Sequence, residues 1–457
     1  MAQTFDVVIV GCGPIGALLA NLLGRRGISV CVVEKQATPF GLPRAIHFDG
    51  EAMRAFQAAG LAENVLPSTM VGRGMLFKNQ QDEALIDWSR DQQIGPMGWY
   101  ESYRVHQPGL EQALVDGLDR FDHVSLERGR TVSIVAQDED GVSLTLDDGT
   151  RLSGRYAVGC DGATSDMRNG LGIEVDDLGY NERWLVVDLN LKVARDDLGD
   201  YSIQFCDPEN PATYVRGVGE RRRWEMRLKK NDPSIVSEKL VWQKLARWIG
   251  PDEAELERSA VYTFRSCVAK KWQVGRCLIA GDAAHQMPPF MGQGMCAGIR
   301  DAANLAWKLD RVIKGADEKL LETYFGEREK NVRQFIELTV RLGKLINQTA
   351  AGNAPSGTMK SIWPSLGEGF GKRDGVGGEL APQMKLPDGQ LADDFAGNGF
   401  YILSNEAMTA TLPIVVGAWE KLDEFGFSAA LIRPDGYAAA GLSSPDQVGE
   451  IMDAFGL

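Results

Sequence analysis

The chain has 457 residues, of which 44% are hydrophobic and 25% are charged, as in globular proteins with two or three domains. A formal net charge of -14 argues against nucleic acid as a partner, because phosphate binding needs a basic surface. No apolar run reaches 18 residues and no basic segment precedes the first strand, so we expect neither membrane insertion nor a signal peptide. Seven scattered cysteines without a CxxC pair, together with only four histidines, predict reduced thiols, no metal site and a cytoplasmic location.

The first elements predict a dinucleotide site. Apolar residues over Phe5–Val10 and Ile28–Val33 are typical of two strands buried on both faces. Between them, the sequence GCGPIG permits a tight bend, a backbone approach to a pyrophosphate and close packing of helix on strand, through Gly11, Gly13 and Gly16. Glu34 follows 18 residues after the last of these glycines, where a carboxylate binds a ribose diol. This motif predicts an ADP-containing cofactor without distinguishing FAD from NAD.

A later segment, Gly275–Leu309, also carries a strand into a helix, in the sequence GRCLIAGDAAHQMPPFMGQGMCAGIRDAANLAWKL. Asp282 follows the predicted strand Cys277–Ala280, where it can bind the hydroxyls of a polyol chain, which FAD contains and NAD lacks. Gly292, Gly294 and Gly298 let the backbone approach a flat ring, and a helix from about Met295 to Leu309 points its positive end at that ring. The segment therefore favours FAD; the alternative is that Asp282 is an ordinary helix N-cap.

Three motifs in this order, GCGPIG with its later Glu, GCDGATSDMR and GDAAHQMPPFMGQGMCAGIRDAANLAWKL, resemble those of the class A flavoprotein aromatic hydroxylases. The likeness covers about residues 4–345, and the stretch QFCDPENPATYVRGVGERRRWEMRL is similar to the 3-(3-hydroxyphenyl)propionate hydroxylase branch. The resemblance implies an FAD monooxygenase that uses NADH or NADPH and O2 to hydroxylate a phenol ortho or para to its oxygen, through a flavin C4a-hydroperoxide, in aromatic catabolism. Epoxidation or Baeyer–Villiger oxidation on the same scaffold stays open, as does a non-catalytic, flavin-bound interaction protein.

The resemblance also implies roles for individual residues. Arg44 and Gln107 would contact the phosphate and ribityl regions of FAD, and Asp161 would serve both FAD and the transient nicotinamide cofactor. Many relatives carry Asn where Cys296 stands, which matters only if a side chain is used there. The full set of residues predicted to bind cofactor is Gly11, Gly13, Pro14, Ile15, Gly16, Glu34, Lys35, Arg44, Gln107, Asp161, Gly162, Asp282, Pro289, Gly292, Gly294, Met295 and Cys296.

Fewer residues point to the substrate. His47 is the candidate catalytic residue, because a loop histidine near the flavin can assist phenol deprotonation, although a structural role is equally compatible with the sequence. His285 is expected to be structural or a neighbour of the flavin. An arginine on the predicted substrate sheet would suit a carboxylate-bearing phenol, but the strand register decides which side chains face the cavity. The predicted substrate residues are Gln204, Tyr214, Arg216, Arg223, Trp224 and Pro288.

We expect a mixed α/β fold in which a Rossmann-like FAD-binding domain is interleaved with an antiparallel substrate sheet. The FAD-binding domain would comprise residues 1–75, 103–176 and 265–345, and the substrate domain residues 76–102 and 177–264. Residues 346–390 are rich in Gly and Pro and predict a linker. Residues 391–457 would form a short tail derived from the thioredoxin-like domain of relatives, for packing or oligomerisation in a monomer or homodimer.

Overall fold

The N-terminal sheet contains the predicted strand, glycine turn, helix and strand. The computed structural model describes residues 3–39, 41, 43–348, 357–359 and 361–457. β1 (Gln3–Val10) pairs in parallel with β2 (Val30–Glu34) and with β11 (Arg151–Gly159). Residues 7–9 of β1, 30–33 of β2 and 156–159 of β11 are buried because layers cover both faces of the sheet there. The strand order is β17-β18-β11-β1-β2-β8, completed by β17 (Gln273–Val274), β18 (Cys277–Ile279) and β8 (Val124–Arg128).

The helices that follow the two sequence motifs pack against each other. α1 (Pro14–Gly24) starts directly after the glycine turn and packs against α7 (Gly294–Ile313), which follows the Gly-Asp segment. The predicted antiparallel meander is present as β9 (Val132–Gln137) and β10 (Val142–Leu146), which lead into β11. The expected Rossmann-like arrangement is thus confirmed.

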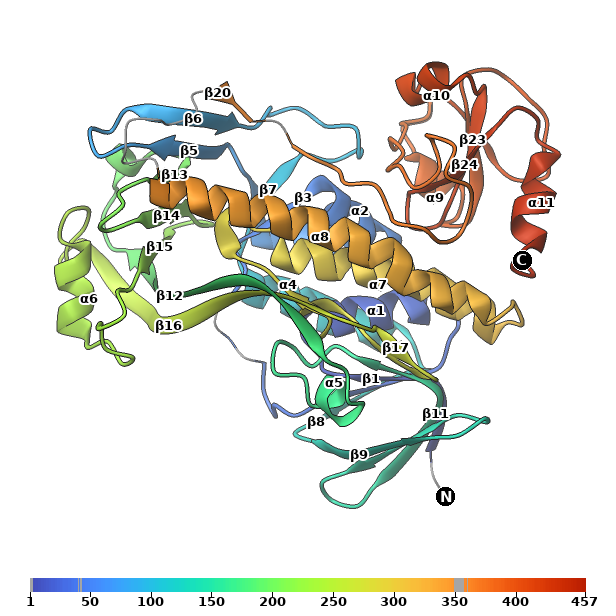
Figure 1. The fold of residues 1–457 in the computed structure, drawn as a ribbon, viewed down its shortest axis with the longest axis horizontal. Helices are drawn as coiled ribbons and strands as arrows, with labels where there is room; N and C mark the ends of the chain where they lie inside the picture. Colours follow the sequence, from blue (N-terminus) through green and yellow to red (C-terminus); the bar gives the residue numbers. More distant parts are fainter. Residues whose placement is uncertain (1–2, 40, 42, 349–356, 360) are drawn as a thin grey trace.

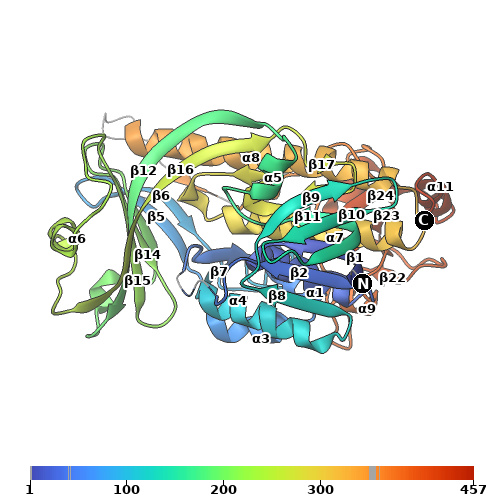
Figure 2. The same cartoon turned by 90° about the horizontal axis from the view of Figure 1, so that it is seen from below.

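A nine-stranded sheet forms the other end of the molecule (Figure 2). Its two longest strands, β12 (Val175–Leu191) and β16 (Ala254–Ala269), pair antiparallel and extend toward the N-terminal sheet. α6 (Glu238–Leu245) covers its outer face. The remaining strands are β19 (His285–Gln286), β15 (Arg221–Arg227), β14 (Ala212–Arg216), β13 (Ser202–Phe205), β5 (Gly74–Lys78), β6 (Ala84–Ser89) and β20 (Gly357–Thr358).

A small sheet of β3 (His47–Asp49), β7 (Ser102–Val105) and β4 (Thr69–Val71) lies between the two large sheets. α8 (Lys319–Gln348) runs along the molecule beside both of them (Figure 1). The other helices here are α2 (Gly50–Ala58), α3 (Ala62–Val65), α4 (Gln107–Asp116) and α5 (Asp166–Gly170). Among the described residues, no helix combines the length and the apolar character that a membrane crossing requires.

The C-terminal segment folds around its own sheet and is joined to the rest by buried polar contacts. The sheet order is β22-β21-β23-β24, and the guanidinium of Arg54 in α2 binds both carboxylate oxygens of Asp393. Tyr437 donates a hydrogen bond to Glu51 at 2.7 Å. This packing agrees with the role expected for the tail, whereas its thioredoxin-like ancestry stays a prediction. The elements are α9 (Ala392–Phe395), β21 (Tyr401–Ser404), β22 (Ile414–Val416), α10 (Glu420–Phe425), β23 (Ala429–Ile432), β24 (Ala438–Leu442) and α11 (Gln447–Asp453).

The predicted linker, residues 346–390, lies partly outside the described residues, at 349–356 and 360. From residue 361 to 390 the chain contains no helix or named strand, as its composition predicted. It is nevertheless packed, since Phe370 and Val376 are fully buried. Residues 361–390 therefore follow a fixed path before the C-terminal sheet.

Candidate active site

One continuous space connects the two glycine-containing motifs. Two adjoining cavities share Gly13, Arg44, Cys160 and Gly162 in their walls. The first extends from this junction past Glu34, Lys35 and Asp161. The second extends past Asp282 and ends against the nine-stranded sheet. Its walls include the predicted cofactor and substrate residues Pro14, Ile15, Gln107, Pro288, Pro289, Gly292, Gly294, Met295 and Arg223.

The three glycines of the first motif have different surroundings. A Cβ atom at Gly16 would lie 2.0 Å from the carbonyl oxygen of Gly11, and Gly11 itself has φ +103°, so both positions require glycine. At Gly13, in contrast, a Cβ atom would meet no protein atom within 4 Å. Glu34 accepts a hydrogen bond from the backbone N–H of Cys12 at 2.7 Å and so fixes the turn. The side of Gly13 therefore faces open space at the N-terminus of α1.

The Asp161 loop is tied to the Asp282 turn by Arg168. Its guanidinium donates to the carbonyl oxygens of Ala163, at 3.1 Å, and Ala283, at 3.0 Å. Asp161 accepts a hydrogen bond from the N–H of Met167 through Oδ2, while its Oδ1 is buried without a partner among the described residues. The sequence motif contained Arg168 but gave it no role; the structure shows that it holds two loops of the cavity together.

Asp282 lies in a three-residue helical turn, Gly281–Ala283, and its side chain borders the cavity. No hydrogen bond from a described residue reaches its carboxylate. The Asp282 side chain is exposed to the cavity, but the enclosing protein still raises its pKa by desolvation, opposed by the charges of His285 and Arg44. The next long helix, α7, has Gln293 as its N-cap, so the alternative reading of Asp282 as a helix cap is wrong.

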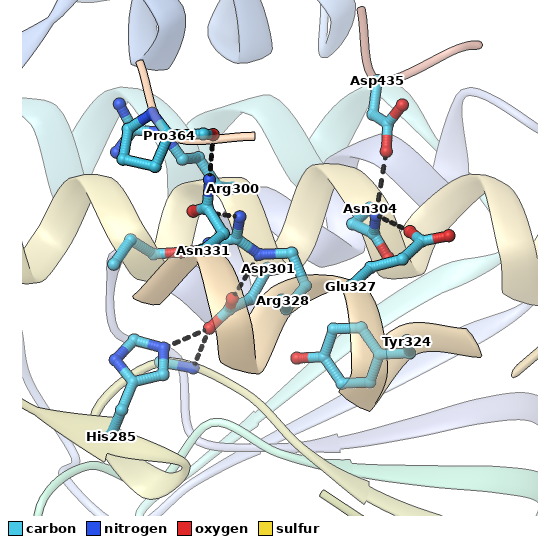
Figure 3. Close-up of polar contacts among 12 residues, drawn as sticks. His285, Arg300, Asp301, Asn304, Tyr324, Glu327, Arg328, Asn331, Pro364 and Asp435 are labelled. Carbon is cyan, nitrogen blue, oxygen red and sulfur yellow. Dashed lines mark hydrogen bonds and ion pairs between the residues drawn. The ribbon is translucent and has the colours of Figure 1, made fainter. Parts of the chain in front are cut away.

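A buried ion-pair network fixes this turn (Figure 3). Asp301 of α7 accepts hydrogen bonds from His285, at 2.6 Å, and from the N–H of Gly281, at 3.0 Å. Its other oxygen accepts from Arg328 of α8 at 2.9 Å. His285 is therefore structural, which is one of the two roles expected for it. No sequence pattern pointed to Asp301 or Arg328, because each is one charged residue among many in a long helix.

The segment Gly292–Met295, called the ring-side segment because the sequence predicts that a flat ring binds there, contains the open N-terminus of α7. Gly292 adopts the left-handed conformation with φ +63°, and no side chain caps the first N–H groups of α7. Met295 borders the cavity. Cys296 is fully buried beneath it, with its Sγ 3.7 Å from the carbonyl oxygen of Gly292, so this side chain does not line the cavity. The Asn-to-Cys difference therefore affects packing below the site.

Alternate residues of strands β14 and β15 in the nine-stranded sheet face the cavity. This alternation shows that some of the predicted substrate residues point away from it. Thr213, Val215, Arg223 and Glu225 line the cavity. Tyr214 and Trp224 point to the opposite face, where they pack with α6 and Trp248. The two predicted aromatic side chains are thus one residue out of phase with the cavity wall.

Two further predicted residues are also absent from the cavity wall. Arg216 donates to the carbonyl oxygen of Gly219 at 2.7 Å and closes a hairpin turn. Gln204 is buried behind the wall, where its Oε1 accepts a hydrogen bond from Thr213 at 2.7 Å. Gln204 therefore orients a cavity residue without bordering the cavity.

Arg223 borders the cavity, but its guanidinium already binds other groups of the protein. It binds the carboxylate of Asp188 at 2.6 and 3.2 Å, and it donates to the carbonyl oxygens of Pro43, at 2.6 Å, and Arg44, at 2.7 Å. Gln107 holds the same loop from the other side by accepting from the N–H groups of Arg44 and Ala45. Arg223 therefore anchors the Arg44 loop to the nine-stranded sheet.

His47 has both ring nitrogens engaged. Its Nε2 lies 3.1 Å from Ser102 Oγ and its Nδ1 lies 3.3 Å from the carbonyl oxygen of Gly292. Burial and the charge of Arg104 lower the pKa of His47 to about 4. The imidazole is therefore neutral at pH 7, with Nδ1 donating to the carbonyl and Nε2 accepting from the hydroxyl.

We expect the low pKa of His47 to make the protein less stable in mild acid. Between pH 6.5 and 4 the unfolded chain binds a proton at this residue and the folded chain does not, so stability falls as pH falls. Urea denaturation should show that lowering the pH from about 7.5 to 5 costs the wild type about 2 kcal/mol more than it costs His47→Gln. Equal pH dependence of the two proteins would contradict this assignment.

The open features of the cavity fit FAD. The free side of Gly13 and the N-terminus of α1 suit a pyrophosphate, the free carboxylate of Asp282 suits hydroxyl groups, and the uncapped N-terminus of α7 suits a ring that gains negative charge. Asp161 adds a buried acceptor without a partner among the described residues. Glu34 lines the first cavity, Gly13 lines both, and Asp282 and the start of α7 line the second, a distribution compatible with the order in which the parts of FAD are joined.

Comparison with known proteins also indicates an FAD-binding protein. The FAD binding domain family matches residues 4–339. A probable NADH-specific resorcinol 4-hydroxylase of Rhodococcus jostii (strain RHA1) is 40% identical over 427 residues, covering 88% of this chain and 79% of the relative. A 3-(3-hydroxy-phenyl)propionate/3-hydroxycinnamic acid hydroxylase of Mycobacterium avium (strain 104) is 38% identical over 362 residues; the match covers 75% of this chain but only 61% of that relative.

Solved structures share the fold over nearly the whole chain. The flavin-dependent monooxygenase PieE, in complex with FAD and substrate, gives a TM-score of 0.83 at 19% identity, with 98% of each chain covered. Aklavinone-11 hydroxylase with FAD and aklavinone gives 0.80 at 20% identity, with 99% of each chain covered. By its match to the family over residues 4–339 and its identity with these relatives, the chain belongs to the FAD binding domain family, among the class A flavoprotein aromatic hydroxylases.

Proposed function

We propose that the chain binds FAD along the continuous cavity and hydroxylates a small phenol, with NADH or NADPH as the reductant and O2 as co-substrate. The relatives named above as a resorcinol hydroxylase and a hydroxyphenylpropionate hydroxylase support a phenolic substrate. The NADH preference in the name of the former favours NADH. The observation that carries the proposal is the free carboxylate of Asp282, placed between the glycine turn and the substrate sheet.

In this proposal different residues of the chain bind different parts of the cofactor. Gly13 and the N-terminus of α1 would bind the pyrophosphate, Glu34 the ribose and Asp282 the ribityl hydroxyls. The N–H groups at the start of α7 would face the ring. When bound, FAD supplies the transfer of electrons from the nicotinamide and the activation of O2.

The protein's own part in the reaction would be to position the phenol and to exclude water. The inner end of the cavity combines apolar side chains, such as Met291 and Phe264, with the polar residues Thr213 and Glu225 of the substrate sheet. Burial raises the pKa of Glu225. A phenol bound at this end of the cavity would contact hydrogen-bonding groups on one side and an apolar surface on the other.

We also propose the expected division into domains. The β1-containing sheet with α1, α7 and α8 would form the FAD-binding part, and the nine-stranded sheet would form the substrate part. Support comes from the cavity, whose two ends are lined by these two sheets. The C-terminal segment would stabilise the FAD-binding part through Arg54 and Tyr437.

The test is a phenol panel with FAD-loaded protein, comprising resorcinol, hydroxyphenylpropionates and hydroxycinnamates, each with NADH and with NADPH. We expect at least one phenol to accelerate nicotinamide oxidation and to gain one oxygen atom from isotopically labelled O2, read by product mass. Flavin reduction without oxygen insertion into any phenol would contradict the proposal.

A further inference from the structure

Arg104 is a buried cation that borders the cavity and lacks an acidic partner. It lies in β7 and is 5% exposed. Its Nη2 donates to the carbonyl oxygen of Gly74 at 3.0 Å, and its Nε is buried without a hydrogen-bond partner. Among the residues that the structure describes, no carboxylate lies within ion-pair distance of its guanidinium. The cavity therefore contains a positive charge that the protein leaves uncompensated.

The other buried or half-buried arginines on this wall each have a carboxylate within ion-pair distance, and this distinguishes them from Arg104. Arg223 and Arg258 share the carboxylate of Asp188. Arg90 donates to Ser361 at 2.7 Å and lies 3.9 Å from Glu101. Burial, reinforced by the charge of Arg90, lowers the pKa of Arg104 to about 10, so it stays protonated at neutral pH. An unpaired buried charge is costly, which favours a ligand that supplies the missing anion.

The position of Arg104 restricts what that ligand can be. In the β3–β7 pair, Arg104 stands opposite His47, whose ring contacts the carbonyl oxygen of Gly292 in the ring-side segment. Its hydrogen bond to Gly74 reaches the first residue of β5 in the substrate sheet. Arg104 thus lies between the ring-side segment and the substrate sheet, away from the glycine turn that we assign to the pyrophosphate.

We propose that Arg104 is a substrate-binding residue that holds an anionic oxygen of the phenolic substrate, either a phenolate or a side-chain carboxylate. The inference rests on the proposed function and adds to it the charge that the substrate carries when bound. A guanidinium donates charge-assisted hydrogen bonds to either oxygen. In the phenolate case the phenol loses its proton to water on binding, and the positive charge of Arg104 lowers the pKa of the bound phenol.

The experiment compares Arg104→Met and Arg104→Lys with a matched control, Arg265→Met, which removes an exposed arginine at the same cavity. Equilibrium dialysis of FAD-loaded protein gives Kd for resorcinol and for 3-(3-hydroxyphenyl)propionate across pH. We expect Arg104→Met to bind the anionic ligand roughly 10- to 100-fold more weakly, the loss typical of a hydrogen bond to a charged group. Arg104→Lys should recover part of this loss and Arg265→Met should bind like the wild type.

The two ligands distinguish the two anions. Weaker binding of both ligands, with loss of the phenolate band in the ultraviolet difference spectrum, identifies a phenolate; weaker binding of the propionate alone identifies the carboxylate. Kd values within about twofold of wild type for Arg104→Met, an equal effect of Arg265→Met, or loss of FAD in place of substrate would overturn the inference. If the wild type hydroxylates phenols and Arg104→Met binds them normally, only this inference fails; if the wild type neither binds nor hydroxylates any phenol, the proposed function fails with it.

Discussion

Replacing Gly13 by Ala is expected to weaken FAD binding on the order of 10- to 100-fold while leaving the stability of the apoprotein nearly unchanged. The new methyl group would meet no protein atom within 4 Å, and the backbone at Gly13 (φ -72°, ψ -175°) suits any residue. It would, however, occupy the space through which a pyrophosphate approaches the N-terminus of α1. The effect should therefore appear in cofactor affinity and not in folding.

Gly16→Ala should behave differently, because its methyl group would lie 2.0 Å from the carbonyl oxygen of Gly11. The backbone must move, so we expect the apoprotein to lose about 1–3 kcal/mol of stability in addition to losing FAD affinity. Gly449→Ala, in α11 with open space around it, is the control for both measurements. FAD fluorescence titration and urea denaturation of the apoproteins measure the two effects. Normal FAD affinity of Gly13→Ala would contradict the placement of the pyrophosphate.

Glu327→Gln is expected to destabilise the protein by about 3–5 kcal/mol, the cost of removing one partner from a buried ion pair. The carboxylate of Glu327, in α8, binds Lys308 and Arg433 at 2.8 Å each, and all three side chains are fully buried. Asn304 donates to the same carboxylate at 2.8 Å and also to Asp435 of the C-terminal segment (Figure 3). The variant would leave two buried cations with less compensation and would loosen the attachment of this segment.

The stabilising effect of the Glu327 carboxylate depends on pH. Arg433 and Lys308 lower the pKa of Glu327 to about 2 despite its burial. Its stabilising effect is therefore complete above pH 4.5 and is lost as pH falls toward 2. Urea denaturation at pH 7 should show the loss for Glu327→Gln and none for Glu322→Gln, which changes an exposed carboxylate in the same helix. Equal stability of these two variants would rule out the proposed role of the cluster.

The glycine turn and the Asp282 segment could be predicted because their chemistry is local. Spacing between Gly11 and Glu34 fixes a strand, a turn and a helix, and short-range sterics then decide which glycines have no room for a side chain. The position of Asp282, after a strand and before a glycine-rich helix start, allowed the same kind of local prediction. Both motifs border the cavity as expected.

Most of the predicted substrate residues do not border the cavity, because strand parity and long-range contacts decide which side chains reach it; of the six, only Arg223 and Pro288 do. Tyr214 and Trp224 differ from Thr213 and Glu225 by one position, which is enough to exchange the two faces of the sheet. Arg104 was overlooked because nothing local separates it from a surface arginine. Its burial and its lack of an acidic partner among the described residues depend on strands from distant parts of the chain.

A crystal structure of the FAD-loaded protein tests the central claim most directly. We predict one FAD along the cavity, with its ribose at Glu34, its pyrophosphate at Gly13, its ribityl hydroxyls at Asp282 and its ring against the start of α7. Electron density that places FAD elsewhere, or that leaves the carboxylate of Asp282 without a ribityl contact, would contradict the account.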